Sequence, residues 1–209
     1  MEILKVINHS KSVLKIAARH GWLPGARYTN LRDIKDFDEI GLIDIDWENY
    51  DFKKHSEVVA AVRPRITVAR DVTKIEELPQ ILEQAHTLAQ YAERVVIVPK
   101  DLRLAEVLED VVPIEFNLGY SVPTKYSGTL IPARCFKRKT HLLGGRPDVQ
   151  RQLASDIDVM SIDCNRFTFD AKYGYFFDGS KFCWLDNGGY DKCLNMSFES
   201  INRIWRDYK

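Results

Sequence analysis

Short apolar runs alternate with helical patterns along most of this chain. Runs such as VVIV at residues 95–98 predict strands, because strands buried on both faces read as continuous hydrophobic segments. Between the runs, apolar residues recur three and four positions apart, which is typical of helices with one buried face. We predict strands at residues 3–7, 42–45, 65–69, 95–98, 111–116, 140–143, 159–162 and 182–185, and helices at 10–19, 55–62, 74–94, 102–108 and 197–208.

The segment 21–38 interrupts this alternation. Its sequence, GWLPGARYTNLRDIKDFD, is polar and rich in turn-forming residues. Proline and glycine weaken a strand because one lacks a backbone donor and the other loses more conformational freedom on folding. We therefore expect a long loop here.

Strands that alternate with helices predict a parallel sheet. The pattern gives seven or eight such units, and eight close most naturally into a barrel. The alternative is an open, doubly wound sheet, but the chain has no GxGxxG motif and no P-loop to support nucleotide binding. We therefore predict a compact (β/α)8 barrel of the α/β class, formed as a single domain by residues 1–209.

Composition excludes several classes of protein. Of the 209 residues, 45% are hydrophobic and 29% are charged, the balance of a soluble globular protein. The formal net charge is zero, so no global electrostatic field favours nucleic acid.

No apolar run approaches the roughly 20 residues that span a bilayer, and the N-terminal segment has no signal-peptide pattern, so we expect no membrane partner and a cytoplasmic protein. The four cysteines form no CxxC pair, which favours reduced thiols and no metal site.

Polar residues and glycines follow most of the predicted strands. Asp163 comes directly after the apolar run 159–162, where a desolvated carboxylate is costly unless it has a partner or a task. Acids that converge at one mouth of a barrel raise one another's pKa, which separates a neutral acid from an ionised partner. The alternative is that each acid caps the helix behind it. We favour an active site built from the strand-end residues His9, Asp44, Asp46, Asp71, Lys100, Asn117, Gly144, Gly145, Asp163 and Asn165.

Positive charge clusters before the strand at 140–143. Arg134, Lys137, Arg138 and Lys139 fall within a short segment, which is either a solvated loop or a loop that contacts phosphates. His141 begins that strand, and we interpret it as structural. Gly119, Gly144 and Gly145 could let a flat ligand or a phosphate approach backbone amides, or could serve only as turns.

The segment HLLGGRPDVQRQLASDIDVMSIDCNRF, residues 141–167, resembles the late-barrel segment of tRNA-guanine transglycosylases. Those enzymes carry a strand ending in Leu-Met-Gly or Leu-Leu-Gly, then Gly-x-Pro, a short helix and a strand closing on Phe-Asp-Cys/Ser. Residues 142–147 and 162–164 match this pattern in type, order and spacing. In that family the acid of the second motif attacks the sugar C1′, and the resemblance assigns that role to Asp163.

Earlier parts of the chain resemble the family more loosely. The resemblance assigns base recognition to Asp71 and to the backbone of Gly119. We also expect Gly144 and Gly145 beside the base, and Tyr120 could stack on it. For the family's other active-site carboxylate we expect Asp46 rather than Asp44, because alternation turns Asp44 to the face of Leu42. The family's Asp-Ser-Gly-Gly-Phe-Gln motif and its zinc site are not present in the sequence. A compact, zinc-less chain looks more like the phage relatives that insert 7-deazaguanine bases into DNA.

The resemblance implies a base-exchange glycosyltransferase. It would replace guanine in nucleic acid by a 7-deazaguanine such as preQ0 through an aspartyl glycosyl-enzyme, in host cytoplasm if phage-encoded. The implied partners are DNA or tRNA, a free 7-deazapurine and a second copy or partner subunit, with no cofactor. We expect phosphate contacts from Arg134, Lys137, Arg138, Lys139, Arg146 and Arg166.

Two other functions fit the same residues. One is a barrel hydrolase or lyase acting on a small sugar or phosphorylated substrate, with Lys100 as a Schiff-base or phosphate residue. The other is a non-catalytic nucleic-acid-binding barrel, in which the acids are ordinary caps.

Overall fold

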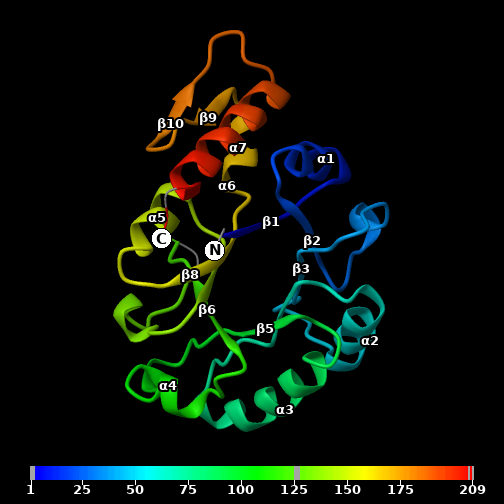
Figure 1. Ribbon diagram of the computed structural model, residues 1–209, viewed down its shortest axis with the longest axis vertical. Helices are drawn as coiled ribbons and strands as arrows, with labels where there is room; N and C mark the ends of the chain where they lie inside the picture. The colour runs from blue at the N-terminus through cyan, green and yellow to red at the C-terminus, as the bar shows by residue number, and fades with distance from the viewer. Residues whose placement is uncertain (1–2, 125–127, 207, 209) are drawn as a thin grey trace.

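Eight parallel strands form a closed barrel, ordered around the ring as they are along the chain (Figure 1). The protein is described here from a computed structural model that covers residues 3–124, 128–206 and 208. Helices alternate with the strands, which confirms the predicted (β/α)8 class. The barrel strands are β1 Leu4–Asn8, β2 Leu23–Arg27, β3 Leu42–Asp44, β4 Ile66–Val68, β5 Arg94–Ile97, β6 Asn117–Ser121, β7 Thr140–Leu143 and β8 Val159–Asp163. The helices are α1 Lys11–Arg19, α2 Phe52–Val62, α3 Leu78–Leu88, α4 Leu108–Val111, α5 Pro147–Leu153, α6 Arg166–Ala171 and α7 Tyr190–Arg206, and β9 Tyr175–Phe177 and β10 Phe182–Trp184 form a separate antiparallel pair.

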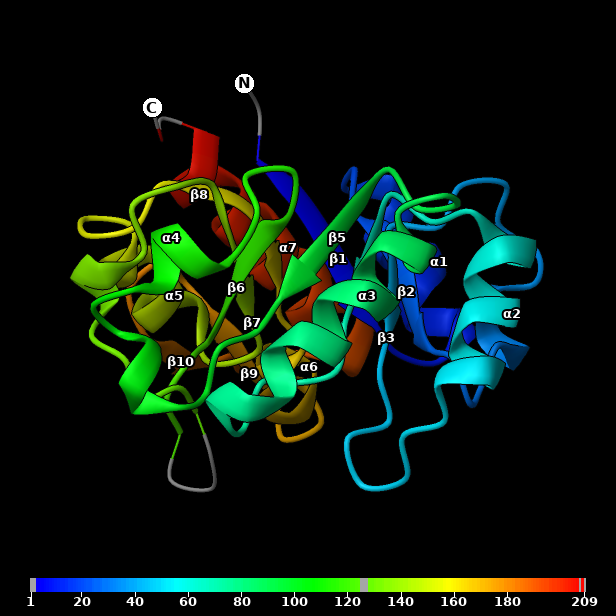
Figure 2. The ribbon, with the colours of Figure 1, turned by 90° about the horizontal axis from the view of Figure 1, so that it is seen from below.

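The first strand closes the ring. Val6 on β1 is in register with Leu23 on β2 and with Asp163 on β8. Because each of the eight barrel strands has a parallel neighbour on both sides, the barrel itself has no unpaired edge, and all eight carboxyl ends lie at the same mouth. In Figure 2 the loop that follows β3 projects on the side away from both termini, which is the side of this mouth. None of the helices in the described part of the chain has the length and apolar character needed to cross a bilayer.

Alternation along the strands separates two apolar regions. One set of side chains fills the inside of the barrel, and we call it the interior cluster: Val6, Leu42, Ile66, Val68, Val96, Val98 and Met160. Their neighbours along the strands, such as Ile7, Ile43 and Ile97, point outward into the layer between barrel and helices. A polar residue at the carboxyl end of a strand therefore faces the mouth only if it shares the face of the interior cluster.

The segment predicted as a long loop contains a strand, so that prediction is wrong. Strand β2 has the sequence LPGAR, whose proline and glycine are unusual for a central strand. Pro24 cannot donate, but its carbonyl accepts from the backbone N–H of Gly41 at 2.8 Å. A Cβ on Gly25 would stand 3.2 Å from the Cβ of Leu42, so the two strands pack closely at this glycine.

The strand predicted at residues 111–116 is also wrong. Those residues end α4 and form a turn, while β6 begins at Asn117. Val112 and Phe116 are buried, which explains why the segment reads as a strand. Consequently Gly119 and Tyr120 lie inside β6 rather than beyond its end.

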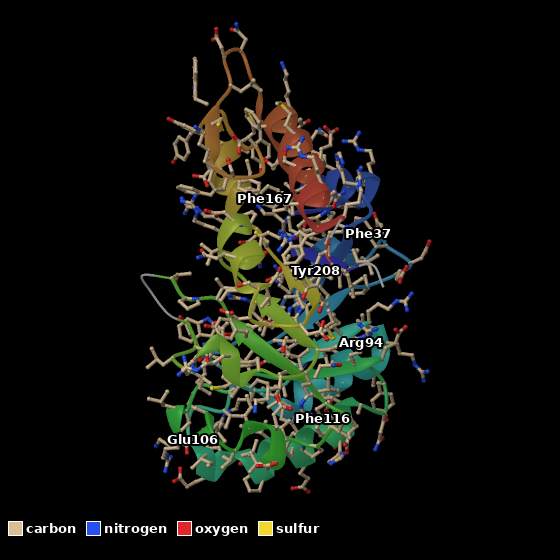
Figure 3. All side chains as sticks on the ribbon, turned by 60° about the vertical axis from the view of Figure 1, so that its left-hand side comes forward. Phe37, Arg94, Glu106, Phe116, Phe167 and Tyr208 are labelled. Atoms are coloured by element: carbon tan, nitrogen blue, oxygen red, sulfur yellow. The ribbon has the colours of Figure 1, made fainter. Side chains whose placement is uncertain are left out.

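The C-terminal part of the chain packs beside the barrel rather than joining it. The predicted strand at 182–185 corresponds to β10, which pairs with β9, and α7 begins at Tyr190, well before the predicted start at Ser197. Inside α7 the Ser197 hydroxyl donates to the Cys193 carbonyl at 2.8 Å and accepts from the Phe177 N–H at 3.0 Å. Phe167 on α6 meets Phe198 on α7 edge to face, with ring centroids 4.9 Å apart, and lies far from Phe116 at the opposite end of the molecule (Figure 3). This packing joins α6, α7 and the β9–β10 hairpin.

Arg138 has a structural task at the amino end of β7. Its guanidinium donates to the backbone carbonyls of Val112, Pro113 and Phe116 at 2.6–3.3 Å, and it pairs with Glu109. The side chain is only 10% exposed. Arg138 therefore fastens the turn after α4 to the bottom of the barrel and is not available to contact phosphates.

We expect Arg138→Met to lower the free energy of unfolding by about 3 kcal/mol, because it leaves buried carbonyls and a carboxylate without their donor. Urea denaturation followed by circular dichroism measures this loss. The matched control is Lys137→Met, whose exposed side chain should change stability by less than about 0.5 kcal/mol. Equal losses in the two variants would contradict the structural task of Arg138.

Candidate active site at the barrel mouth

A cavity of about 460 Å³ opens at the carboxyl ends of the strands. Its size falls in the range of roughly 300–1,000 Å³ that is typical of small-molecule sites. Apolar side chains of the interior cluster form its floor, and acids, hydroxyls and a lysine surround them. The lining residues are Asp44, Ile45, Trp47, Val68, Asp71, Thr73, Val98, Lys100, Ser121, Gly128 and Leu143.

Asp44 and Asp163 form a coupled carboxyl pair beside this cavity. Asp44 ends β3 within the cavity wall, and Asp163 ends β8 in register with Leu143, which lines the cavity. Burial, together with the charge of Asp44, raises the pKa of Asp163 to about 7. Burial raises the pKa of Asp44 to about 6, although its Oδ1 accepts from the Ile45 N–H at 2.8 Å and Arg27 opposes the shift.

The Oδ1 atom of Asp163 is buried and has no hydrogen-bond partner among the described residues. A buried carboxylate oxygen without a donor is costly, so it normally has a ligand, a water or a proton. At neutral pH the pair can therefore hold one proton and one negative charge. Such a pair can donate a proton and also stabilise or attack a positive centre.

Asp71 and Lys100 form a second pair in the cavity. Nζ of Lys100 lies 3.8 Å from Oδ2 of Asp71, and the side chains are 19% and 27% exposed. Burial lowers the pKa of Lys100, and the nearby carboxylate opposes this. Burial likewise raises the pKa of Asp71 against the effect of the lysine. The cavity thus holds a donor and an acceptor side by side.

Asp44, rather than the expected Asp46, faces the mouth. Asp44 does share the face of Leu42, as alternation predicts, but that face is the inside of the barrel. Asp46 instead accepts from the backbone N–H groups of Glu48 and Asn49 at 3.3 and 3.4 Å and so caps a turn. Our preference for Asp46 is therefore corrected in favour of Asp44.

The predicted base-binding residues Asp71, Gly119 and Tyr120 lie in three different environments. Asp71 lines the cavity, as expected. Gly119 lies inside β6, where an added Cβ would come within 2.6–2.9 Å of Val96, Val98 and Leu143, so this glycine gives room to the interior cluster. Tyr120 points outward, 5% exposed, and packs edge to face on Phe136. The prediction that Tyr120 stacks on a ligand at the mouth is wrong, because alternation turns it away.

Gly144 and Gly145 form the turn after β7 at the mouth. Both have positive φ, 64° and 85°, and a Cβ on Gly145 would stand 2.4 Å from Val122. Gln150 on α5 fixes this turn, since its Nε2 donates to the carbonyls of Gly144 and Asp163 at 2.7 and 2.8 Å. Gln150 was not among the predicted site residues, although its place on the helix between the two motifs was a usable signal.

The predicted phosphate-binding residues divide between the two ends of the barrel. Lys137, Arg138 and Lys139 precede β7 and so lie at its amino end, away from the mouth. Arg134 is exposed on the loop that leads there. The prediction that this cluster serves the mouth is therefore wrong for the residues next to β7.

Arg146 and Arg166 follow β7 and β8 at the mouth end. Arg146 pairs with Asp148 at 3.0 Å and lies over the ring of Phe182. Arg166 pairs with Asp170 at 3.1 Å and lies over Phe169. Both are about half exposed and remain candidates for contact with a polyanion.

Trp47 is a lining residue that sequence reasoning missed. It stands on the loop after β3 and is 66% exposed, which is unusual for a tryptophan. Its position three residues after Asp44 was the available signal. An exposed ring at the rim of a cavity can stack on a planar ligand.

His141 on β7 is not among the residues that line the cavity. His141 is fully buried, and its Nδ1 lies 2.8 Å from the Ser161 hydroxyl, in agreement with a structural role. No cluster of three or more His, Cys, Asp or Glu side chains suited to a metal occurs in residues 3–124, 128–206 and 208.

The fold and the mouth define a (β/α)8 barrel with a buried carboxyl pair next to a lysine–aspartate pair. The chain belongs to the family described as a family of unknown function (DUF6610), whose model matches residues 17–206. The matched range includes Asp44, Asp71, Lys100 and Asp163. No curated protein matches the chain.

We expect Asp163→Asn to be more stable than the unchanged protein at pH 8, by about 2 kcal/mol, and equally stable near pH 4. Unfolding lets the carboxyl ionise with its ordinary pKa of 3.8, whereas burial raises its pKa to about 7 in the fold. The folded state then binds more protons between about pH 4 and 7, so this group lowers stability as the pH rises through that window.

Urea denaturation across this pH range measures the effect. Asp156→Asn, at an exposed position after α5, is the control and should change stability by less than about 0.5 kcal/mol. A gain for Asp163→Asn that does not depend on pH would contradict the raised pKa.

Proposed function

We propose that this protein is a base-exchange glycosyltransferase that replaces guanine in nucleic acid by a 7-deazaguanine. The observation that carries the proposal is the coupled carboxyl pair of Asp44 and Asp163 beside a cavity suited to a purine. The resemblance of residues 141–167 to guanine transglycosylases supports the same chemistry. We expect DNA as the polymer, with tRNA as the second polymer to be tested, and an activity in the cytoplasm.

In the first half of the reaction Asp163 attacks C1′ of the target nucleotide. The C1′–N9 bond breaks, its electron pair passes to the base, and the neutral carboxyl of Asp44 supplies the proton that the leaving guanine takes up. Without substrate the proton of the pair resides on Asp163, which has the higher pKa. Positive charge that develops at the sugar favours the ionised form of Asp163, so the pair reacts with the proton on Asp44. The product is an ester between Asp163 and C1′.

In the second half the incoming 7-deazapurine gives its N9 proton to the Asp44 carboxylate. N9 attacks C1′, the ester bond breaks, and Asp163 leaves as a carboxylate. The proton count is restored, so the cycle is complete with the chain's own residues. A target base inside a duplex has to leave the stack first, at a cost of a few kcal/mol.

We expect the protein to form a covalent adduct with its polymer when no free base is supplied, and to incorporate radiolabelled guanine when it is. Asp163→Asn should lower incorporation at least about 1,000-fold and abolish the adduct, because an amide is not a nucleophile at C1′. The adduct is read on a denaturing gel with DNA and tRNA in separate reactions.

The matched comparison is Asp44→Asn against Asp46→Asn. Loss of the proton donor should lower incorporation about 100-fold or more, whereas the turn-capping Asp46 should matter less than about threefold. A fully active Asp163→Asn variant would refute the mechanism.

We expect Trp47→Leu to weaken binding of the free base about tenfold or more, since stacking on an aromatic ring contributes about 1–3 kcal/mol per base. Calorimetric titration with guanine measures this, and Trp184→Leu, at an exposed tryptophan on β10 outside the cavity lining, is the control. Equal affinities of Trp47→Leu and the unchanged protein would remove Trp47 from the base site.

A second candidate rests on the lysine. Burial lowers the pKa of Lys100, which is the condition for a Schiff base with a carbonyl substrate. A lyase of that kind would be trapped on Lys100 by borohydride in the presence of a sugar or sugar phosphate and would bind no guanine.

A further inference from the structure

The lysine–aspartate pair in the cavity is held by backbone pairing between the segments that follow β4 and β5. Val72 and Pro99 form a parallel bridge, and the Lys100 N–H donates to the Val72 carbonyl at 2.9 Å. Lys100 and Asp71 are therefore attached to two adjacent, fastened segments. Their relative position is set by the barrel rather than by the contact between them.

The pair does not complete a hydrogen bond. The distance of 3.8 Å between Nζ and Oδ2 exceeds the usual donor–acceptor range of about 2.7–3.2 Å. Both side chains are mostly removed from water, and removing charges from water is costly unless they are well paired. Lys100 and Asp71 thus provide a desolvated donor and a desolvated acceptor that do not hydrogen-bond to each other. They are suited to bind a ligand with an acceptor next to a donor.

We propose that Lys100 and Asp71 read the Watson–Crick edge of the base, with the Lys100 ammonium donating to the C6 carbonyl oxygen and the Asp71 carboxylate accepting from N1–H and the 2-amino group. This inference rests on the proposed function and adds Lys100 as a specificity-determining residue for it.

The order of groups on the two purines explains why such a pair selects guanine. Guanine presents an acceptor at O6 next to a donor at N1, which complements an ammonium next to a carboxylate. Adenine presents a donor at N6 and an acceptor at N1, so both of its groups would face groups of the same kind. Because buried polar groups left without a partner are penalised strongly, the wrong base is rejected at two positions.

The remaining walls favour a flat ring between the pair and the carboxyls. Val68, Val98 and Leu143 provide apolar surface on the floor, and Trp47 stands at the rim. Asp44 lines the same cavity and is close enough to Asp71 for their charges to interact. A base whose edge contacts Asp71 and Lys100 therefore extends toward the carboxyl pair.

The test is the affinity of the intact protein for free bases that differ at one position. Guanine and 6-thioguanine share N1–H and the 2-amino group but differ at the C6 acceptor, where sulfur accepts more weakly than oxygen. We expect the unchanged protein to prefer guanine about tenfold, as one charge-assisted hydrogen bond allows. In Lys100→Met the preference should fall to about one, with most of the loss on guanine.

Two further variants separate the hydrogen bond from charge and from folding. Lys100→Gln keeps an N–H donor and should retain part of the preference for guanine. Lys53→Met removes a positive charge from the exposed face of α2 and should bind both bases as the unchanged protein does. Hypoxanthine, which lacks the 2-amino group, should bind more weakly than guanine to every Lys100 variant, because that contact belongs to Asp71.

The outcomes distinguish this inference from the proposed function. If base exchange occurs and Lys100→Met weakens guanine and 6-thioguanine equally, Lys100 only holds Asp71 ionised, and its reading of C6 is refuted. If the unchanged protein binds neither base and exchanges none, the proposed function is wrong and the inference falls with it. A preference that vanishes in Lys100→Met and partly returns in Lys100→Gln supports both.

Discussion

Closure of the barrel between β1 and β8 is the constraint on which the rest of the structure depends. It brings Asp163, on the last barrel strand, into register with Val6 on the first. It also places the carboxyl end of β8 around the same mouth as that of β3, so that the charges of Asp44 and Asp163 interact. The chemistry of this mouth is therefore a product of the ring and not of any one strand.

The fold holds charged groups at the mouth where burial opposes their ionised forms. The interior cluster below the cavity is apolar, and burial above it raises the pKa of Asp44, Asp71 and Asp163. Burial also lowers the pKa of Lys100. The structure holds these groups with backbone pairing and with Gln150, which fastens the ends of β7 and β8, while Asp163 keeps an oxygen without a partner among the described residues. Sites that hold such groups at a cost in stability are typical of catalysis and binding.

Where sequence reasoning failed, the failures have physical causes. Strand β2 was not predicted because its proline and glycine disfavour a strand locally. Closure of the barrel nevertheless places a strand there, between β1 and β3. The segment 111–116 was mistaken for a strand because Val112 and Phe116 are buried in a turn, as apolar residues of a strand would be in a sheet. Because of that error Gly119 and Tyr120 were expected in the loop after a strand, whereas they lie inside β6.

The sequence by itself determined the alternation of strands and helices, the barrel class, and Asp163 and Asp71 as acids at strand ends, because these follow from local periodicity and from short motifs. Only the tertiary structure decided which face of β3 is the inside of the barrel, and hence that Asp44 rather than Asp46 reaches the mouth. It also assigned Arg138 to a structural task, brought Lys100 next to Asp71 and set Trp47 at the rim. Each of these depends on contacts between residues far apart in the chain, and periodicity within one element carries no information about such contacts.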